Sequence, residues 1–262
     1  MQSKYCIDIM KTIESRYPVH MACEWDNVGL LAGRVDKEVK QIYIALDATD
    51  QVIEDAIYCK ADMLITHHPL IFSSLRSVTN ESFIGRRLLR LLQHDISYYA
   101  MHTNYDILGM ADLAGGRMEL SNQEVLEISE QDHGTEGIGR VGNLKHPITL
   151  QACCDFVKEQ FSLQQVKVFG DLQQPVFKIA IAPGSGKSMV SSALDKSADV
   201  LITGDIDHHT GLDALAQGLA VIDAGHYGLE HIFIEDVRLF CTNQWDDIKI
   251  HTAPIVHPFQ VV

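Results

Sequence analysis

An internal repeat is the feature of this 262-residue sequence that most constrains its fold. Residues 42–66 and 179–203 align without a gap at an offset of 137 positions, with nine identities in 25. Each copy reads as an apolar strand, a turn, a helix-length stretch, a second turn and a second apolar strand that ends at Thr66 or Thr203. This order indicates a βαβ unit with two parallel strands. The identical positions in the first copy are Ile42, Ile44, Ala45, Ala56, Ala61, Asp62, Leu64, Ile65 and Thr66.

The repeat predicts an α/β protein of two duplicated α/β halves with mostly parallel sheets. We assign residues 1–126 to the first half and residues 127–262 to the second. The junction is expected in the stretch 115–145, which is rich in Gly, Glu and Gln. A functional site would then lie in the cleft between the halves, because ligands collect at the carboxyl ends of parallel strands.

Two further segments have a readable pattern. A helix is expected from Thr149 to about Gln160, with Thr149 as its N-cap. In the tail, residues 236–262, the apolar and β-branched runs Val237–Phe240 and Ile248–Ile255 look like strands that could return to the first half.

Charge and composition limit the partners. The chain has 35 acidic and 21 basic side chains, a net charge of −14, so a broad nucleic-acid surface is not expected. No apolar run approaches the roughly 18–20 residues of a membrane span, and the N-terminus lacks the order of a secretion signal. The six cysteines form no CxxC pair, as expected for reduced thiols in the cytoplasm.

Paired histidines follow the first repeat. His67 and His68 come directly after the strand ending at Thr66, and Pro69 helps to end that strand. Neutral imidazole is a common ligand of transition metals. The pair alone would fit an ordinary polar loop equally well.

Matching histidine–acid motifs strengthen the metal interpretation. His102 and Asp106 follow a short apolar strand in the first half, and His226 and Glu230 follow one in the second. A four-residue spacing puts both side chains on one face of a helical turn. One site shared by the halves could hold more ligands than a single structural zinc takes, and two metal ions 3.5–4 Å apart would use them. The expected ligands are His67, His68, Asp106, His226 and Glu230, with His102 as an added ligand or a neighbour of the ligands.

These motifs, together with residues 24–30 (EWDNVGL), resemble the YbgI-like dinuclear-metal proteins, often called GTP cyclohydrolase 1 type 2 homologues. The resemblance runs from about residue 5 to residue 260. It implies two duplicated α/β domains, a two-metal site on the residues named above, and a toroidal homohexamer built as a trimer of dimers.

Three other motifs have simpler interpretations. Residues 183–188 (PGSGKS) end like a phosphate loop, but the required first glycine is Ile181, so we expect a strand-to-helix turn. Residues 205–209 (DIDHH) could line the metal site through Asp205, His208 or His209, or could cap a helix over Thr210–Gln217. Residues 25–27 (WDN) are expected to form a packing and hydrogen-bonding corner.

The sequence therefore predicts a cytoplasmic metal-dependent hydrolase. Two divalent transition-metal ions (zinc, iron, manganese or nickel) would activate water toward a nucleotide-like or heterocyclic small molecule, and a cyclohydrolase is implied by the resemblance. The alternative is a non-catalytic metal-binding, metal-delivery or ring-scaffold protein. The apolar end Ile250–Val262 would complete a sheet or contribute to the hexamer.

Overall fold

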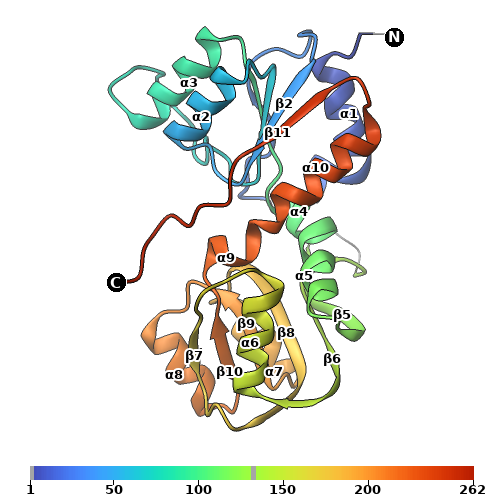
Figure 1. The fold of residues 1–262 in the computed structure, drawn as a ribbon, viewed down its shortest axis with the longest axis vertical. Helices are drawn as coiled ribbons and strands as arrows, with labels where there is room; N and C mark the ends of the chain where they lie inside the picture. The colour runs from blue at the N-terminus through green and yellow to red at the C-terminus, as the bar shows by residue number, and fades with distance from the viewer. Residues whose placement is uncertain (1–2, 131–133) are drawn as a thin grey trace. The chain divides into compact units, whose positions relative to one another are not determined.

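The computed structural model describes residues 3–130 and 134–262 and divides the chain into two compact units. The first unit comprises Met1–Tyr105 and Phe233–Val256, and the second comprises Asp106–Ile232 and His257–Val262. The chain thus leaves the first unit, builds the second, and returns to the first (Figure 1).

The first unit has a five-stranded sheet in which β2, β3, β4 and β11 are parallel and β1 is antiparallel to β4. The strands, in spatial order, are β1 (Gly29–Ala32), β4 (Ser97–Ala100), β3 (Met63–Thr66), β2 (Gln41–Ala45) and β11 (Lys249–Thr252). Its helical segments are α1 (Cys6–Arg16), η1 (Val19–Met21), α2 (Asp50–Tyr58), α3 (Phe83–Gln93), α4 (Thr103–Tyr105) and most of α10 (Ile232–Gln244).

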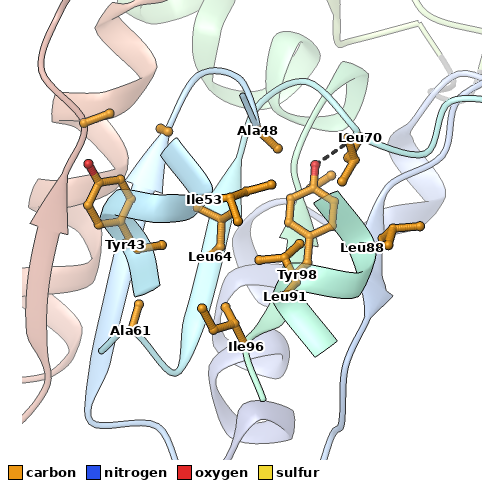
Figure 2. Packing of buried hydrophobic residues seen from close by; sticks show 14 residues of the cluster. Tyr43, Ala48, Ile53, Ala61, Leu64, Leu70, Leu88, Leu91, Ile96 and Tyr98 are labelled. Atoms are coloured by element: carbon orange, nitrogen blue, oxygen red, sulfur yellow. Dashed lines mark hydrogen bonds between the residues drawn. The ribbon is translucent and has the colours of Figure 1, made fainter. Parts of the chain in front are cut away.

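Helices α2 and α3 supply much of the core on one face of this sheet. Ile53 of α2 and Leu88 and Leu91 of α3 pack with the strand residues Leu64 and Tyr98 (Figure 2). Both helices start at a side-chain cap, because Thr49 accepts a hydrogen bond from the Val52 amide and Ser82 from the Gly85 amide. Both helices therefore pack on β3 and β4, the strands that His67, His68 and His102 follow.

The second unit has a six-stranded sheet with a parallel centre, β8–β9–β10, and antiparallel pairings on either side. The strands, in spatial order, are β5 (Ser121–Ile128), β6 (Gly137–Thr149), β8 (Pro175–Ser185), β9 (Val200–Gly204), β10 (Ala220–Asp223) and β7 (Lys167–Phe169). Its helices are η2 (Asp106–Met110), α5 (Ala111–Arg117), α6 (Leu150–Gln160), α7 (Met189–Asp195), α8 (His208–Ala216) and α9 (His226–Glu230).

The predicted α/β class is confirmed, and so is the strand–helix–strand order of both repeats. The first copy is β2–α2–β3 and the second is β8–α7–β9, each with parallel strands. The helix expected after Thr149 is α6, and the Thr149 side chain accepts a hydrogen bond from the Ala152 amide. The boundary after residue 126 stays a prediction.

One local expectation was wrong. Val237–Phe240 belongs to helix α10, not to a strand, because Phe233, Val237, Phe240 and Cys241 recur at helical spacing on its buried side. The stretch 115–145 contains β5 and part of β6, its residues 131–133 lie outside the described residues, and its role as the junction of the halves stays a prediction. No helix in the described ranges combines the length and apolar character that a membrane crossing requires.

Candidate metal centre

Adjacent parallel strands end together in each unit and bring the predicted residues to one edge of each sheet. In the first unit Thr66 of β3 lies opposite Ala100 of β4, so His67, His68 and His102 follow neighbouring strand ends. In the second unit Thr203 of β9 lies opposite Asp223 of β10. Asp205 and His226 follow those two ends.

The buried hydroxyl of Tyr98 shapes the turn that carries the paired histidines. It accepts a hydrogen bond from the Leu70 amide at 2.7 Å, drawn in Figure 2, and lies 2.8 Å from the Thr66 hydroxyl and 3.1 Å from the His68 carbonyl oxygen. Burial raises the pKa of Tyr98 to about 12, so the hydroxyl stays protonated. The turn takes residues 67 and 68 out of the alternating strand geometry, and both imidazoles can then face the same way.

His67, His68 and His102 form a compact group of imidazoles. One ligand nitrogen from each ring lies within 4.8 Å of the others, and the ring centroids are 4.8, 5.2 and 5.5 Å apart. We call these three residues the histidine group. Three nitrogen donors this close can bind one transition-metal ion.

Each of these imidazoles is oriented through its Nδ1 atom. A carbonyl or carboxylate oxygen can only accept a hydrogen bond, so each Nδ1 carries the proton and Nε2 is the basic nitrogen. Holding one ring nitrogen in this way is how proteins fix the tautomer and direction of a metal-binding histidine. The contacts are His67 to the Met101 carbonyl oxygen at 2.8 Å, His68 to Asp47 at 2.8 Å and His102 to Asp26 at 2.9 Å.

Asp26 remains a carboxylate at neutral pH. Burial alone would raise its pKa, but the hydrogen bonds and charge of His102 and the hydrogen bonds from Thr103 outweigh burial and lower the pKa to about 2. The Thr103 amide donates to one Asp26 oxygen at 2.9 Å. Asp26 therefore connects the His102 ring to the start of helix α4.

The second unit contributes a histidine and two carboxylates, which we call the carboxylate group: His226, Glu230 and Asp106. Helix α9 puts His226 Nε2 3.0 Å from Glu230 Oε2, as the four-residue spacing predicts. Two ligands at right angles on an ion with bonds of about 2.1 Å are about 3 Å apart. Asp106, at the start of the π-helical turn η2, has a carboxylate oxygen within 4.8 Å of one from Glu230.

His226 is oriented like the other three imidazoles, because its Nδ1 lies 2.7 Å from Asp205 Oδ2. Asp205 adopts a left-handed backbone conformation with φ of +57°, which aspartate tolerates better than most residues. Gly184 leaves room for the Glu230 carboxylate, since a Cβ at position 184 would lie 2.6 Å from Glu230 Oε1.

The donors fit a transition-metal site. Four imidazole nitrogens and two carboxylates suit zinc, iron, manganese or nickel, and the metal-capable groups found among the described residues contain no cysteine. In all four imidazoles the hydrogen-bonded nitrogen is Nδ1, which leaves Nε2 as the nitrogen available to a metal ion. The structure therefore has six candidate donor residues: three histidines in the first unit, and one histidine and two carboxylates in the second.

The phosphate-like segment has structural reasons for its residues. A Cβ on Gly186 would lie 1.8 Å from the Thr203 hydroxyl, so only glycine fits there. Lys187 pairs with Asp207 at 2.9 Å, and Asp207 caps helix α8 by accepting a hydrogen bond from the Thr210 amide. Among the residues that the structure describes, His208 and His209 join no metal-capable group.

Three residues next to the predicted ligands were missed or misread. Asp47 and Asp205 were not recognised as partners of histidines, although each follows the carboxyl end of a parallel strand, a signal that could have found them. Trp25 does pack against Phe72 and His102, as expected of a corner, but its exposure of 59% was not foreseen. Asp26 and Asn27 do form the expected hydrogen-bonding corner.

Comparison with known proteins supports one family along the whole chain. The Duf34/NIF3 (NGG1p interacting factor 3) family matches residues 5–257. A "GTP cyclohydrolase 1 type 2 homolog" from Clostridium acetobutylicum is 34% identical over 225 residues, which cover 85% of this chain and 84% of the relative. A Bacillus cereus protein related to NIF3 has a similar structure, with a TM-score of 0.92, 25% identity and full coverage of both chains. The protein ybgI shares the fold, with a TM-score of 0.84 at 21% identity over 98% of this chain and 100% of that one. The match of 253 residues and the identity to curated relatives lead to one conclusion: the chain belongs to the Duf34/NIF3 family.

Proposed function

We propose that this chain is a metal-dependent hydrolase that acts on a nucleotide-like or heterocyclic small molecule. The observation that supports the proposal best is the common orientation of four histidines, each hydrogen-bonded at Nδ1 so that Nε2 is the nitrogen available to a metal ion. When bound, a pair of divalent ions supplies Lewis acidity and lowers the pKa of water. The relatives' name, GTP cyclohydrolase 1 type 2 homolog, is that of an enzyme class acting on a nucleotide.

The chain's own residues would bind and orient. Asp47, Asp26 and Asp205 keep three imidazoles in one tautomer, so the ligand nitrogens need little rearrangement on binding. The carboxylates Glu230 and Asp106 add negative charge that balances a bound cation. A site built this way is preorganised, which is what hydrolytic catalysis at a metal centre requires.

We further propose that the histidine group and the carboxylate group serve one dinuclear centre. The duplication supports this, because each half carries a matching histidine–acid motif after a strand. Elemental analysis of protein purified without chelator should find close to two equivalents of zinc, iron, manganese or nickel. A value below about half an equivalent that metal soaking does not restore would contradict the proposal.

Substitutions on each unit separate one shared centre from two independent sites. For a shared centre, His67→Ala and Glu230→Gln should each reduce the content of both ions. For independent sites, each substitution should remove one ion and leave the other. His208→Ala, an exposed histidine outside both groups, is the matched control and should retain full metal content.

Turnover separates the hydrolase from its alternative. Metal-loaded protein should hydrolyse at least one member of a panel of nucleotides, cyclic nucleotides and heterocyclic amides, and a chelator should abolish that activity. If two ions bind and no member of the panel is consumed, the chain is instead a metal-binding or metal-delivery protein.

The proposal also covers the location of the protein and its oligomeric state. The six cysteines form no disulfide and four of them are buried, which suits the reducing cytoplasm. We also propose a ring of six chains. The exposed apolar side chains near the C-terminus are suited to an interface between copies; they are Ile255, Val256, Phe259, Val261 and Val262.

A further inference from the structure

Two exposed aromatic rings lie beside the histidine group. The side chain of Trp25 is 59% exposed and that of Phe72 is 53% exposed. Their ring centroids are 5.7 Å apart and the ring planes are inclined by 39°. Single exposed apolar residues are common on proteins, but two aromatic rings in contact at the edge of a candidate site are not explained by chance exposure.

The chain holds both rings in place through their neighbours in sequence. Asp26, next to Trp25, accepts hydrogen bonds from Thr103 and contacts His102. The Asn27 side-chain amide donates to the carbonyl oxygen of Ile71, the residue before Phe72, at 2.5 Å. Polar contacts of the residues next to each ring therefore tie the segment of Trp25 to that of Phe72 and to that of His102.

Both rings also contact the imidazole of His102. The Trp25 and His102 centroids are 5.9 Å apart with planes inclined by 72°, and those of Phe72 and His102 are 6.3 Å apart at 65°. A planar group stacked on either ring would therefore bind next to a ring that contacts His102. That is where a ring nitrogen or carbonyl oxygen could approach an ion bound at the histidine group.

We propose that Trp25 and Phe72 bind the planar heterocycle of the substrate by stacking. This inference rests on the proposed function and specifies its substrate class as molecules with an aromatic heterocyclic ring. Stacking on protein aromatic side chains tolerates different bases, because every base has a π face. The two apolar rings favour a planar substrate ring. The nearby histidine group favours a substrate ring with polar atoms at its edge.

The intrinsic fluorescence of the protein provides a direct test. The chain has two tryptophans, Trp25, which is exposed, and Trp245, which is only 6% exposed. In a Trp245→Phe background, metal-loaded protein is titrated with adenosine, guanosine and cytidine, and with ribose as a non-planar control. Saturable quenching of Trp25 by at least one nucleoside, and none by ribose, is expected.

Variants then measure the contribution of each ring. Phe72→Ala, read by the same fluorescence, and Trp25→Ala, read by calorimetry, should weaken nucleoside binding by roughly 5- to 150-fold, the range for loss of one stacking partner. Tyr58→Ala removes a ring that is 88% exposed on α2 and should leave binding unchanged. Wild-type affinity in both ring variants would overturn the inference, as would quenching by ribose equal to that by the nucleosides. A Trp25 signal that depends on protein concentration alone, without nucleoside, would identify a contact between copies and also overturn it.

The outcome can be separated from that of the proposed function. Nucleoside binding that requires Trp25, with two bound ions and no hydrolysis of any probe, supports the stacking surface and contradicts the hydrolase. Hydrolysis with an unchanged KM in Trp25→Ala contradicts the stacking surface and supports the hydrolase.

Discussion

Gly184→Ala should weaken metal binding without disrupting the fold. Gly184 has a left-handed φ of +85°, and a Cβ there would lie 2.6 Å from Glu230 Oε1. Real Cβ atoms essentially never come closer than 3.0 Å to another heavy atom, so the carboxylate oxygen must move by at least 0.4 Å (3.0 − 2.6). Metal–ligand distances tolerate only about 0.2 Å of change.

The expected loss of metal affinity follows from what is observed when groups around a metal ligand are disturbed in other proteins. Disturbing the groups around a metal ligand typically costs about 10- to 100-fold in affinity. That corresponds to about 1.4–2.8 kcal/mol of binding free energy. Alanine in the left-handed region also costs roughly 1–2 kcal/mol of folding free energy, whatever surrounds it.

Gly218→Ala is the matched control for the backbone cost. Its φ is +90°, and nothing lies within 4 Å of the added Cβ, so only the conformational cost applies. Both variants should lower the thermal midpoint of the metal-free protein by about 2–8 °C, using 2–4 °C per kcal/mol. Zinc titration by calorimetry should show weaker binding for Gly184→Ala alone. Wild-type affinity in Gly184→Ala, or an equal loss in Gly218→Ala, would refute the role given to the space beside Glu230.

The remaining predictions concern partners, folding, thiols and assembly. Asp205→Ala should lower metal affinity about 10- to 100-fold by releasing a histidine, whereas Asp207→Ala removes a helix cap, costs about 1 kcal/mol of stability and leaves metal affinity unchanged in the same calorimetric titration. Tyr98→Phe should cost about 1–3 kcal/mol in denaturant unfolding, because a buried amide loses its acceptor; a cost near zero would show that the turn does not need the hydroxyl. Cys23 and Cys59 should react first with a thiol reagent at pH 8, and the other four thiols only after unfolding, since burial raises the pKa of two of those four to about 12; rapid reaction of more than two thiols would contradict this. Light scattering should give about six times the 29.2 kDa chain mass, and a monomer at micromolar concentration would contradict the ring.

The central strands and helices could be predicted because the same strand–helix–strand pattern occurs in both copies of the repeat. Identities concentrated at strand positions showed where β2, β3, β8 and β9 lie. Helix α10 was misread because its apolar residues include β-branched ones, which favour strands locally, while tertiary packing selects the helix. The run Ile248–Ile255 was expected to be able to return to the first half, but its partner strand could not be predicted, because β11 and β2 are about 200 positions apart and no local pattern encodes such a pairing.

The candidate ligands could be predicted because their chemistry is explicit in the residue type and their place after strands is readable. Their orientation could not be, since it depends on contacts such as the Met101 carbonyl oxygen, which any residue would supply. The exposure of Trp25 could not be predicted either, because the residue type alone does not tell a tryptophan buried in a core from one exposed at a site.

The interrupted chain path of the first unit has a consequence during synthesis on the ribosome. Its sheet cannot be completed until Phe233–Val256 emerges, about 150 residues after Tyr105. At 5–20 residues per second this delay is roughly 8–30 s. During that time β2 can pair only with β3, so its other edge is exposed next to an incompletely covered apolar core. The second unit, whose sheet lies within one continuous segment, can form first. Nascent chains stalled before residue 233 should therefore bind chaperones through the first unit and release them once β11 has been made.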